Sequence, residues 1–225
     1  MLWIVLGVGV LALLVLPGWW VKRVLRRHAG ERPDYPGTGG DMARHLLGKL
    51  GLDDVTVVSS DAGDHYDPRS RSVRLTPDKL DGKSLTAVVV AAHEVGHAVQ
   101  HARGEPLFHS RTALAYLAIW MQRLAPAALL ITPFLAFYTP SASRLALIIA
   151  VGAMLIGTLV HLATLPVEWD ASFGKALPLL QDGGYLNEQD MQDARRILLA
   201  AALTYVAGSL FSLLNVWQWL RYLRR

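Results

Sequence analysis

The chain of 225 residues contains no cysteine and little charge. Without cysteine it can form neither a disulfide scaffold, nor a zinc site with thiolate ligands, nor a thiol nucleophile. Only 18% of the residues are charged, against about 25% in typical soluble domains. Apolar residues make up 52%, which is too many for a disordered chain. The net charge is only +4, and the basic residues cluster beside apolar runs, which favours membrane insertion over nucleic-acid binding.

The first apolar run, residues 2–21, predicts an N-terminal membrane anchor. It carries no charge and is long enough as a helix to cross a bilayer core of about 30 Å. It has neither the basic start nor the small-residue cleavage site of a signal peptide. Lys22, Arg23, Arg26 and Arg27 follow directly, so we expect the chain from Lys22 onward to be cytoplasmic and Met1 to be outside.

Three further apolar runs predict additional membrane segments. They cover Leu124–Tyr138, Leu145–Leu165 and Leu198–Leu220. The first of these is short and contains Pro126 and Pro133, so it either spans the membrane or forms a re-entrant hairpin. The last ends in three arginines, and its orientation stays open.

The region between the anchor and these runs has the composition of a water-soluble domain. Residues 22–111 hold 14 Lys and Arg and 12 Asp and Glu, interspersed. We expect a loop at Gly37, Gly39 and Gly40, and turns over Asp61–Asp67. The expected elements are a helix over Asp41–Leu50, short strands over Val55–Val58 and Arg71–Thr76, and a helix from Ser84 to Arg103 that ends at Gly104.

The strongest chemical signal is His93-Glu94-Val95-Gly96-His97, inside the last of these expected helices. Residues four apart lie on one face of a helix, so the two imidazoles can bind one Zn²⁺. Glu94 lies beside them, where a carboxylate can take a proton from water activated by the metal. The small Gly96 lets another element approach closely. We therefore predict metal ligands at His93 and His97 and a general base at Glu94.

A catalytic zinc site needs a third protein ligand. The long pattern with a third histidine on the same segment is excluded, because Arg103 stands where that histidine would be. His101 is rotated away from His93 on a straight helix, and nothing selects His109. We favour Glu168, which we expect in the first turn of a helix that starts near Pro166. Asp170 is the reserve ligand, or the acceptor of an imidazole N–H.

Membrane topology gives an independent test of Glu168. A ligand must lie on the same membrane side as His93, so an even number of spans must separate the two residues. Two candidate spans do so. The motif itself has only Leu85–Ala92 as an uninterrupted apolar flank, too short to cross a bilayer. We therefore expect the site at or above the cytoplasmic surface.

Four blocks of this chain, in this order, resemble the YugP-like neutral zinc metallopeptidases of prokaryotic membranes. The blocks are His65–Thr76, Ser84–Gln100, Leu165–Ser172 and Ala200–Ala207. The resemblance implies Zn²⁺ as cofactor, His93 and His97 as ligands and Glu94 as the catalytic acid and base. The matching Pro-Val-Glu block carries Glu168 over as third ligand.

These observations together predict a mainly α protein with multipass transmembrane helices and a small α+β zincin-like cytoplasmic domain that carries the His-Glu-x-x-His helix. The predicted function is hydrolysis of peptide bonds in protein substrates by a membrane-bound zinc endopeptidase, with polypeptide and the lipid bilayer as partners. The alternative is a non-catalytic zinc-binding membrane scaffold or chaperone. The predicted parts are an anchor (1–21), a cytoplasmic metalloprotease region (22–123), a transmembrane hairpin (124–165), a helical segment with the third ligand (166–197), and a C-terminal transmembrane helix with a basic tail (198–225).

Two details stay open at this level. The donor that stabilises the reaction's oxyanion could be His65, Tyr66, His101 or His109. The strand Arg71–Thr76 could be a scaffold strand, or it could offer a free edge to an extended peptide.

Overall fold

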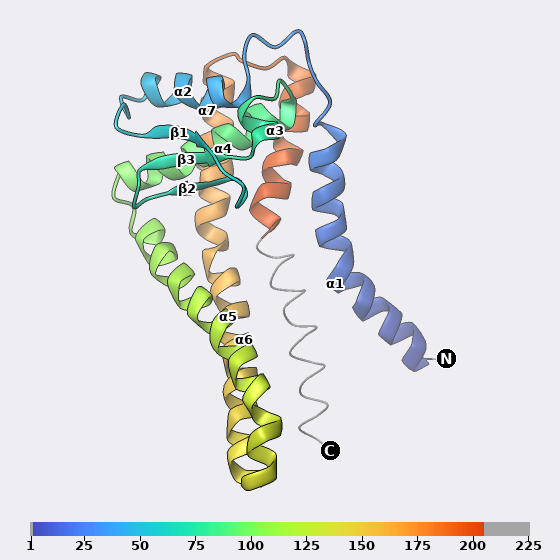
Figure 1. Cartoon of the computed structure of the whole chain (residues 1–225). Helices are drawn as coiled ribbons and strands as arrows, with labels where there is room; N and C mark the ends of the chain where they lie inside the picture. The colour runs from blue at the N-terminus through green and yellow to red at the C-terminus, as the bar shows by residue number, and fades with distance from the viewer. Residues whose placement is uncertain (1, 205–225) are drawn as a thin grey trace. The chain divides into compact units, whose positions relative to one another are not determined.

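The computed structural model describes residues 2–204, which are mainly helical with one small mixed sheet (Figure 1). They form two compact units: residues 2–18, 110–165 and 204 make the first, and residues 19–109 and 166–203 the second. The elements are α1 (Leu2–Arg27), α2 (Gly39–Lys49), β1 (Thr56–Ser59), β2 (His65–Asp67), β3 (Ser72–Leu75), α3 (Pro77–Leu80), α4 (Leu85–Ala102), α5 (Pro106–Tyr138), α6 (Pro140–Trp169), the π-helix η1 (Asp170–Ala176), α7 (Leu177–Asp182) and a helix over residues 188–204.

The first unit consists of apolar helices. Within residues 2–204, the segments Pro106–Leu135 and Ser141–Asp182 are long and apolar enough to cross a membrane. Large apolar side chains of α5 are open to the surroundings, with Leu130 73%, Phe134 69% and Phe137 88% exposed. An apolar surface of this kind suits lipid better than water. The predicted anchor forms the first part of α1 and stays a prediction, and most of the predicted span 198–220 lies outside the described residues.

Three prolines lie inside the apolar helices α5 and α6, and one of them was wrongly expected to begin a helix. α5 starts at Pro106 and continues through Pro126 and Pro133, so the run Leu124–Tyr138 is only its second half. Pro166 does not begin a helix but lies inside α6. A proline removes one helical hydrogen bond, and an apolar helix tolerates this because no water competes for its remaining backbone groups.

The sheet has the strand order β1-β3-β2. β1 runs parallel to β3, and β2 runs antiparallel to it with Tyr66 opposite Val73. β2 was expected to be a turn, because three residues are too few to display an alternating pattern. Of the two alternatives left open for Arg71–Thr76, the structure favours the scaffold strand over the free edge, since β3 has a neighbour on each side. The outer edges of the sheet belong to β1 and β2.

The helix α2 begins two residues earlier than expected. Thr38 caps it, since the Thr38 Oγ1 accepts from the Asp41 N–H at 3.1 Å and the Asp41 carboxylate accepts from the Thr38 N–H at 3.0 Å. This capping box places Gly39 and Gly40 in the first turn rather than in a loop. A Cβ on Gly39 would lie 2.4 Å from the carbonyl oxygen of Lys79, so α2 can pack here only with glycine.

The helix α4 confirms the expectation for Ser84–Arg103 and forms the centre of the second unit. The Ser84 Oγ accepts from the Ala87 N–H at 3.1 Å, and Arg103 caps the other end. Every residue from Leu85 to Gln100 is buried. A helix that is apolar on most of its circumference is stable only when it is surrounded. Its neighbours are α2, α3, β3, β2, α7 and η1.

An ion pair fastens the segment after α1 to the last described helix. The Arg32 guanidinium donates to both carboxylate oxygens of Asp190 at 2.9 and 3.0 Å, and the Tyr35 hydroxyl donates to Asp190 at 3.1 Å. The hydrogen bonds from Arg32 hold the pKa of Asp190 below its usual value. Residues far apart in sequence are thus joined in the second unit.

The contact between α4 and η1 is close enough to need glycine, as the sequence suggested for Gly96. A Cβ on Gly96 would lie 2.7 Å from the carbonyl oxygen of Ala171 and 3.3 Å from the Cβ of Lys175. η1 is a π-helix, a wider turn that occurs frequently at functional sites. Gly96 therefore sets the distance between the two elements.

We expect Gly96→Ala to lower the free energy of unfolding by about 1–3 kcal/mol, because an added methyl forces α4 and η1 apart. Gly48→Ala is the matched control: Gly48 lies in α2 with no atom within 4 Å of the added Cβ, so the change should stabilise by up to about 1 kcal/mol. Chemical denaturation in detergent, followed by tryptophan fluorescence, measures both. Equal stabilities of the two variants would contradict the interpretation of Gly96.

Candidate metal centre

Two buried imidazoles from successive turns of α4 form one side of the site. His93 is 5% and His97 1% exposed, and their ring centroids lie 4.8 Å apart. This is the arrangement expected for residues four apart on a helix.

Glu168, in the last turn of α6, meets both rings although at least 71 residues of sequence separate it from either histidine. Its Oε2 lies 3.3 Å from His93 Nε2 and 3.2 Å from His97 Nε2. Glu168 is only 1% exposed. The three side chains each offer a ligand atom within 4.8 Å of the others. The structure thus brings together the three residues that the sequence predicted as ligands.

Gln100 determines which nitrogen of His97 carries the proton. The Gln100 Nε2 donates to the Val167 carbonyl at 3.0 Å and to the Asp170 carboxylate at 2.8 Å. Both partners are acceptors, so the amide orientation is fixed and the Oε1 faces His97 Nδ1 at 2.9 Å. That oxygen can only accept. His97 therefore donates from Nδ1, which leaves Nε2 as the ring nitrogen that faces Glu168 and can bind a metal.

Ser172 has the same effect on His93. The Ser172 hydroxyl donates to the Leu198 carbonyl at 3.2 Å, and its oxygen lies 3.1 Å from His93 Nδ1. A hydroxyl has one proton, so the Ser172 oxygen accepts from His93 Nδ1–H. The lone pair of His93 Nε2 then also points toward the Glu168 carboxylate.

The donor atoms fit a zinc ion. Two imidazole lone pairs and a carboxylate oxygen are all acceptors, and a buried cluster of acceptors is stable only with a cation. Two histidines and one glutamate are a known ligand set of catalytic zinc. In a tetrahedral site with bonds of about 2.0–2.2 Å, ligand atoms lie about 3.3–3.5 Å apart. The Nε2–Oε2 distances of 3.2 and 3.3 Å match that spacing.

Asp170 was predicted as the reserve ligand or as the acceptor of an imidazole N–H, and the structure places it elsewhere. It accepts from Gln100 and from the Lys175 ammonium, each at 2.8 Å, and no contact with either imidazole is found in the described residues. Gln100 stands between Asp170 and His97. Lys175 also contacts Glu105 at 3.0 Å and so connects η1 to the residue before α5. The acceptor of the imidazole N–H is Gln100 for His97 and Ser172 for His93.

Sequence reasoning missed Gln100 and Ser172, although both had a signal. Gln100 follows His97 by three residues, on the same face of α4. Ser172 follows Glu168 by four residues across the junction of α6 and η1. Helical spacing from each ligand would have selected both as candidates for a role behind the ligands.

Of the four candidates for the oxyanion donor, Tyr66 and His109 both lie beside His101, with the His101 and His109 ring centroids 6.0 Å apart, and His65 has a different partner. Tyr66 Oη lies 2.8 Å from His101 Nδ1, and His101 stacks on Phe108 with centroids 5.5 Å apart. Burial lowers the pKa of His101, with Arg71 and His109 adding to the effect, so this ring is neutral at neutral pH. His65 instead contacts the Gly63 carbonyl at 3.0 Å. Phe108 also faces His97, at 6.1 Å between centroids.

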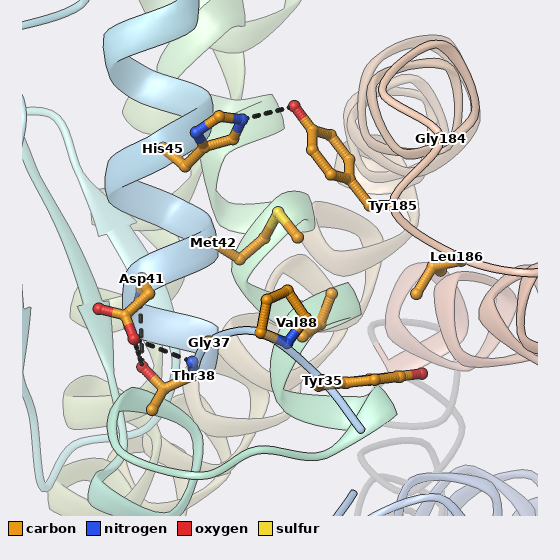
Figure 2. A pocket seen from close by; sticks show the side chains of 11 residues that line it. Tyr35, Gly37, Thr38, Asp41, Met42, His45, Val88, Gly184, Tyr185 and Leu186 are labelled. Carbon is orange, nitrogen blue, oxygen red and sulfur yellow. Dashed lines mark hydrogen bonds between the residues drawn. The ribbon is translucent and has the colours of Figure 1, made fainter. Parts of the chain in front are cut away.

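A separate cavity of about 430 Å³ lies beside α2 (Figure 2). Met42, Val88 and Leu186 give it apolar walls. The polar groups at its rim are paired within the protein, with His45 Nε2 2.7 Å from the Tyr185 hydroxyl. It shares no residue with the metal centre.

Comparisons with known proteins identify relatives of this chain. Residues 3–224 match the family described as "Putative neutral zinc metallopeptidase". The chain is 33% identical over 220 residues to the "Putative membrane protease YugP" of Bacillus subtilis (strain 168), covering 96% of this chain and 94% of that protein. No solved structure matches the chain. The match confirms the resemblance seen in the sequence and zinc as the cofactor. The chain therefore belongs to the neutral zinc metallopeptidase family.

Proposed function

We propose that this protein is a membrane-bound zinc endopeptidase that hydrolyses polypeptides at the cytoplasmic face of the membrane. One observation carries the proposal: two imidazoles with fixed tautomers and one buried carboxylate direct acceptor atoms at a common point. Both imidazoles are on the helix that also holds Glu94. Family membership and the name of the Bacillus subtilis relative support the same reaction class.

The cluster supports catalysis better than a purely structural metal role. Within residues 2–204 it contains three metal-ligating side chains, not four. Structural zinc sites are closed by four protein ligands, whereas catalytic sites leave one position for water or substrate. A glutamate beside the first ligand also has no function in a structural site. These points favour the enzyme over the scaffold or chaperone.

In the proposed mechanism Glu94 moves the proton. His93, His97 and Glu168 would hold a zinc ion, whose Lewis acidity would acidify water and polarise the scissile carbonyl. Glu94 accepts a proton from the attacking water and then delivers it to the leaving amine, so no proton is gained or lost. Glu94 is buried at 6% exposure, which keeps bulk water from competing for that proton. Gln100 and Ser172 keep the imidazoles oriented throughout.

Removing a ligand or its support should reduce zinc binding in a graded way. We expect one zinc per wild-type chain, loss of zinc in His93→Ala and Glu168→Ala, and about 10–100-fold weaker affinity in Gln100→Ala, because that ring loses its orienting acceptor. Competition with a chromogenic chelator measures the affinity of purified protein in detergent. Full zinc in Glu168→Ala would remove Glu168 from the site.

Replacing the proposed base should separate chemistry from metal binding. We expect Glu94→Gln to keep zinc and to lower the cleavage rate of an unfolded protein such as casein by at least about 10²-fold, the contribution typical of a general base. Zinc content and gel-based cleavage are measured on the same preparation. Undiminished cleavage by the zinc-loaded variant would refute the role of Glu94.

The absence of cysteine makes the membrane face directly testable. We expect Asp61→Cys to react with a membrane-impermeant maleimide only in inverted vesicles, because the basic residues at the end of α1 predict a cytoplasmic domain. Thr139→Cys, between α5 and α6, should react only in intact spheroplasts. Both positions are exposed. Labelling of the Asp61→Cys variant in intact spheroplasts would place the site outside.

A further inference from the structure

The last turns of α1, residues 19–27, have one packed face and one exposed face. Val21 is buried, and Val24 and Leu25 pack against the core of the second unit. The side chains of the exposed face are Trp19, Lys22, Arg23, Arg26 and Arg27. Their spacing of i, i+3, i+4, i+7 and i+8 defines one side of a helix. All the cations of this segment therefore lie on its outer side, which we call the basic face.

Hydrogen bonds to α4 fix the orientation of this helix end. The Thr86 hydroxyl donates to the Leu25 carbonyl at 2.8 Å, and the Thr86 N–H donates to the His28 carbonyl at 3.1 Å. Carbonyls at the end of a helix have no partner within the helix, so these bonds complete α1. On the same side, His28 Nδ1 lies 3.8 Å from the Asp193 carboxylate. Because its opposite side is held in this way, the basic face is directed away from the second unit.

The four cations of the basic face repel one another and have no acidic partner in the part of the chain that the structure describes. The first acidic residue of the sequence is Glu31, beyond the end of α1. Arg26 and Arg27 lie in the last turn, where the helix dipole favours cations. Lys22 and Arg23 lie before that turn, and each precedes another cation by four residues, a destabilising arrangement. An anion bound outside the helix would relieve this repulsion.

Trp19 indicates which kind of anion fits. Its side chain is 55% exposed, and the Arg23 guanidinium lies 5.2 Å from the centre of its ring. The uncharged run of residues 2–21 ends at this point. Tryptophan is enriched at membrane–water interfaces, where its apolar ring and its polar N–H are both accommodated. An acidic protein or a nucleic acid would offer negative charge alone, whereas an anionic bilayer offers negative charge directly beside an apolar layer.

We propose that the basic face binds the phosphate groups of anionic phospholipids at the membrane surface. The planar guanidinium groups can each bond two phosphate oxygens, and the Lys22 ammonium adds a point charge. Anionic lipid at the membrane surface stabilises nearby basic side chains. Because residues 19–27 are bonded to α4 through Thr86, lipid bound here holds the second unit, with its metal centre, at an anionic bilayer. This binding is independent of peptidase activity.

A short-range quencher tests lipid binding at the basic face itself. The chain has no cysteine, so Ala29→Cys, at an exposed position just after α1, takes a single fluorophore in full-length protein in nonionic detergent. The probes are phosphatidylglycerol and phosphatidylcholine that carry the same nitroxide near the headgroup end of one acyl chain. They differ only in headgroup, so lipid that contacts the apolar helices without selectivity quenches equally with both.

Double variants in this background test the residues. Arg26→Gln with Arg27→Gln removes two cations of the basic face and leaves Lys22 to orient α1 in the membrane. Arg44→Gln with Lys49→Gln removes the same charge from α2, where both side chains are exposed. Arg26→Lys with Arg27→Lys keeps the charge of the basic face. Circular dichroism and zinc content report whether each variant is folded.

We expect phosphatidylglycerol to quench the parent protein at a lower concentration than phosphatidylcholine. The glutamine pair on the basic face should raise the half-quenching concentration of phosphatidylglycerol roughly five- to thirtyfold, the effect of two cations beside the membrane. The α2 pair and the lysine pair should each change it less than about twofold. In the parent, raising the salt concentration from about 0.05 to about 0.5 M should weaken quenching by phosphatidylglycerol alone, because exposed charges are screened.

Equal quenching of the parent by both lipids, or equal losses in the two glutamine pairs, would overturn the proposal. Quenching by phosphatidylglycerol that does not depend on salt would overturn it without any variant. Inorganic phosphate, added at constant ionic strength, separates lipid from free anion. Displacement of the lipid by phosphate would assign the basic face to a soluble anion and refute the lipid site.

Discussion

Two imidazoles and a carboxylate can bind one buried cation only if the ring nitrogens that face it carry no proton. In this protein Gln100 and Ser172 impose that condition. Each accepts from an Nδ1–H, and each is itself constrained by donation to a backbone carbonyl. The lone pairs that remain face Glu168. The affinity for a cation therefore originates in hydrogen bonds behind the ligands as much as in the ligands themselves.

The rest of the second unit keeps that arrangement rigid. α4 is buried from Leu85 to Gln100, so its two histidines cannot turn toward solvent. η1 approaches α4 at Gly96, and its wider turn places Ser172 behind His93. Gln100 bonds the backbone at Val167, next to Glu168. The same few contacts thus hold the helix pair together and orient the site, and function here depends directly on packing.

Local patterns predicted the elements that have strong local signals. The apolar periodicity and the Ser84 cap placed α4, and helical spacing within His93–His97 placed two ligands and Glu94 on it. β2 was missed because it forms a strand only by pairing with β3, and three residues carry no pattern of their own. The helix start expected at Pro166 was wrong because proline is a weaker break in an apolar helix than in a solvated one.

The sequence alone determined the chemistry available to this protein: the absence of thiols, the apolar helices and the paired histidines with their glutamate all follow from residue identity and spacing. The counting of spans was consistent with Glu168, since a ligand must share a membrane side with its partners. Only the tertiary structure decided which groups stand behind the ligands and which strand edge is open. Those choices depend on distances between segments about 70 residues apart, and no local rule of helix or strand geometry fixes them.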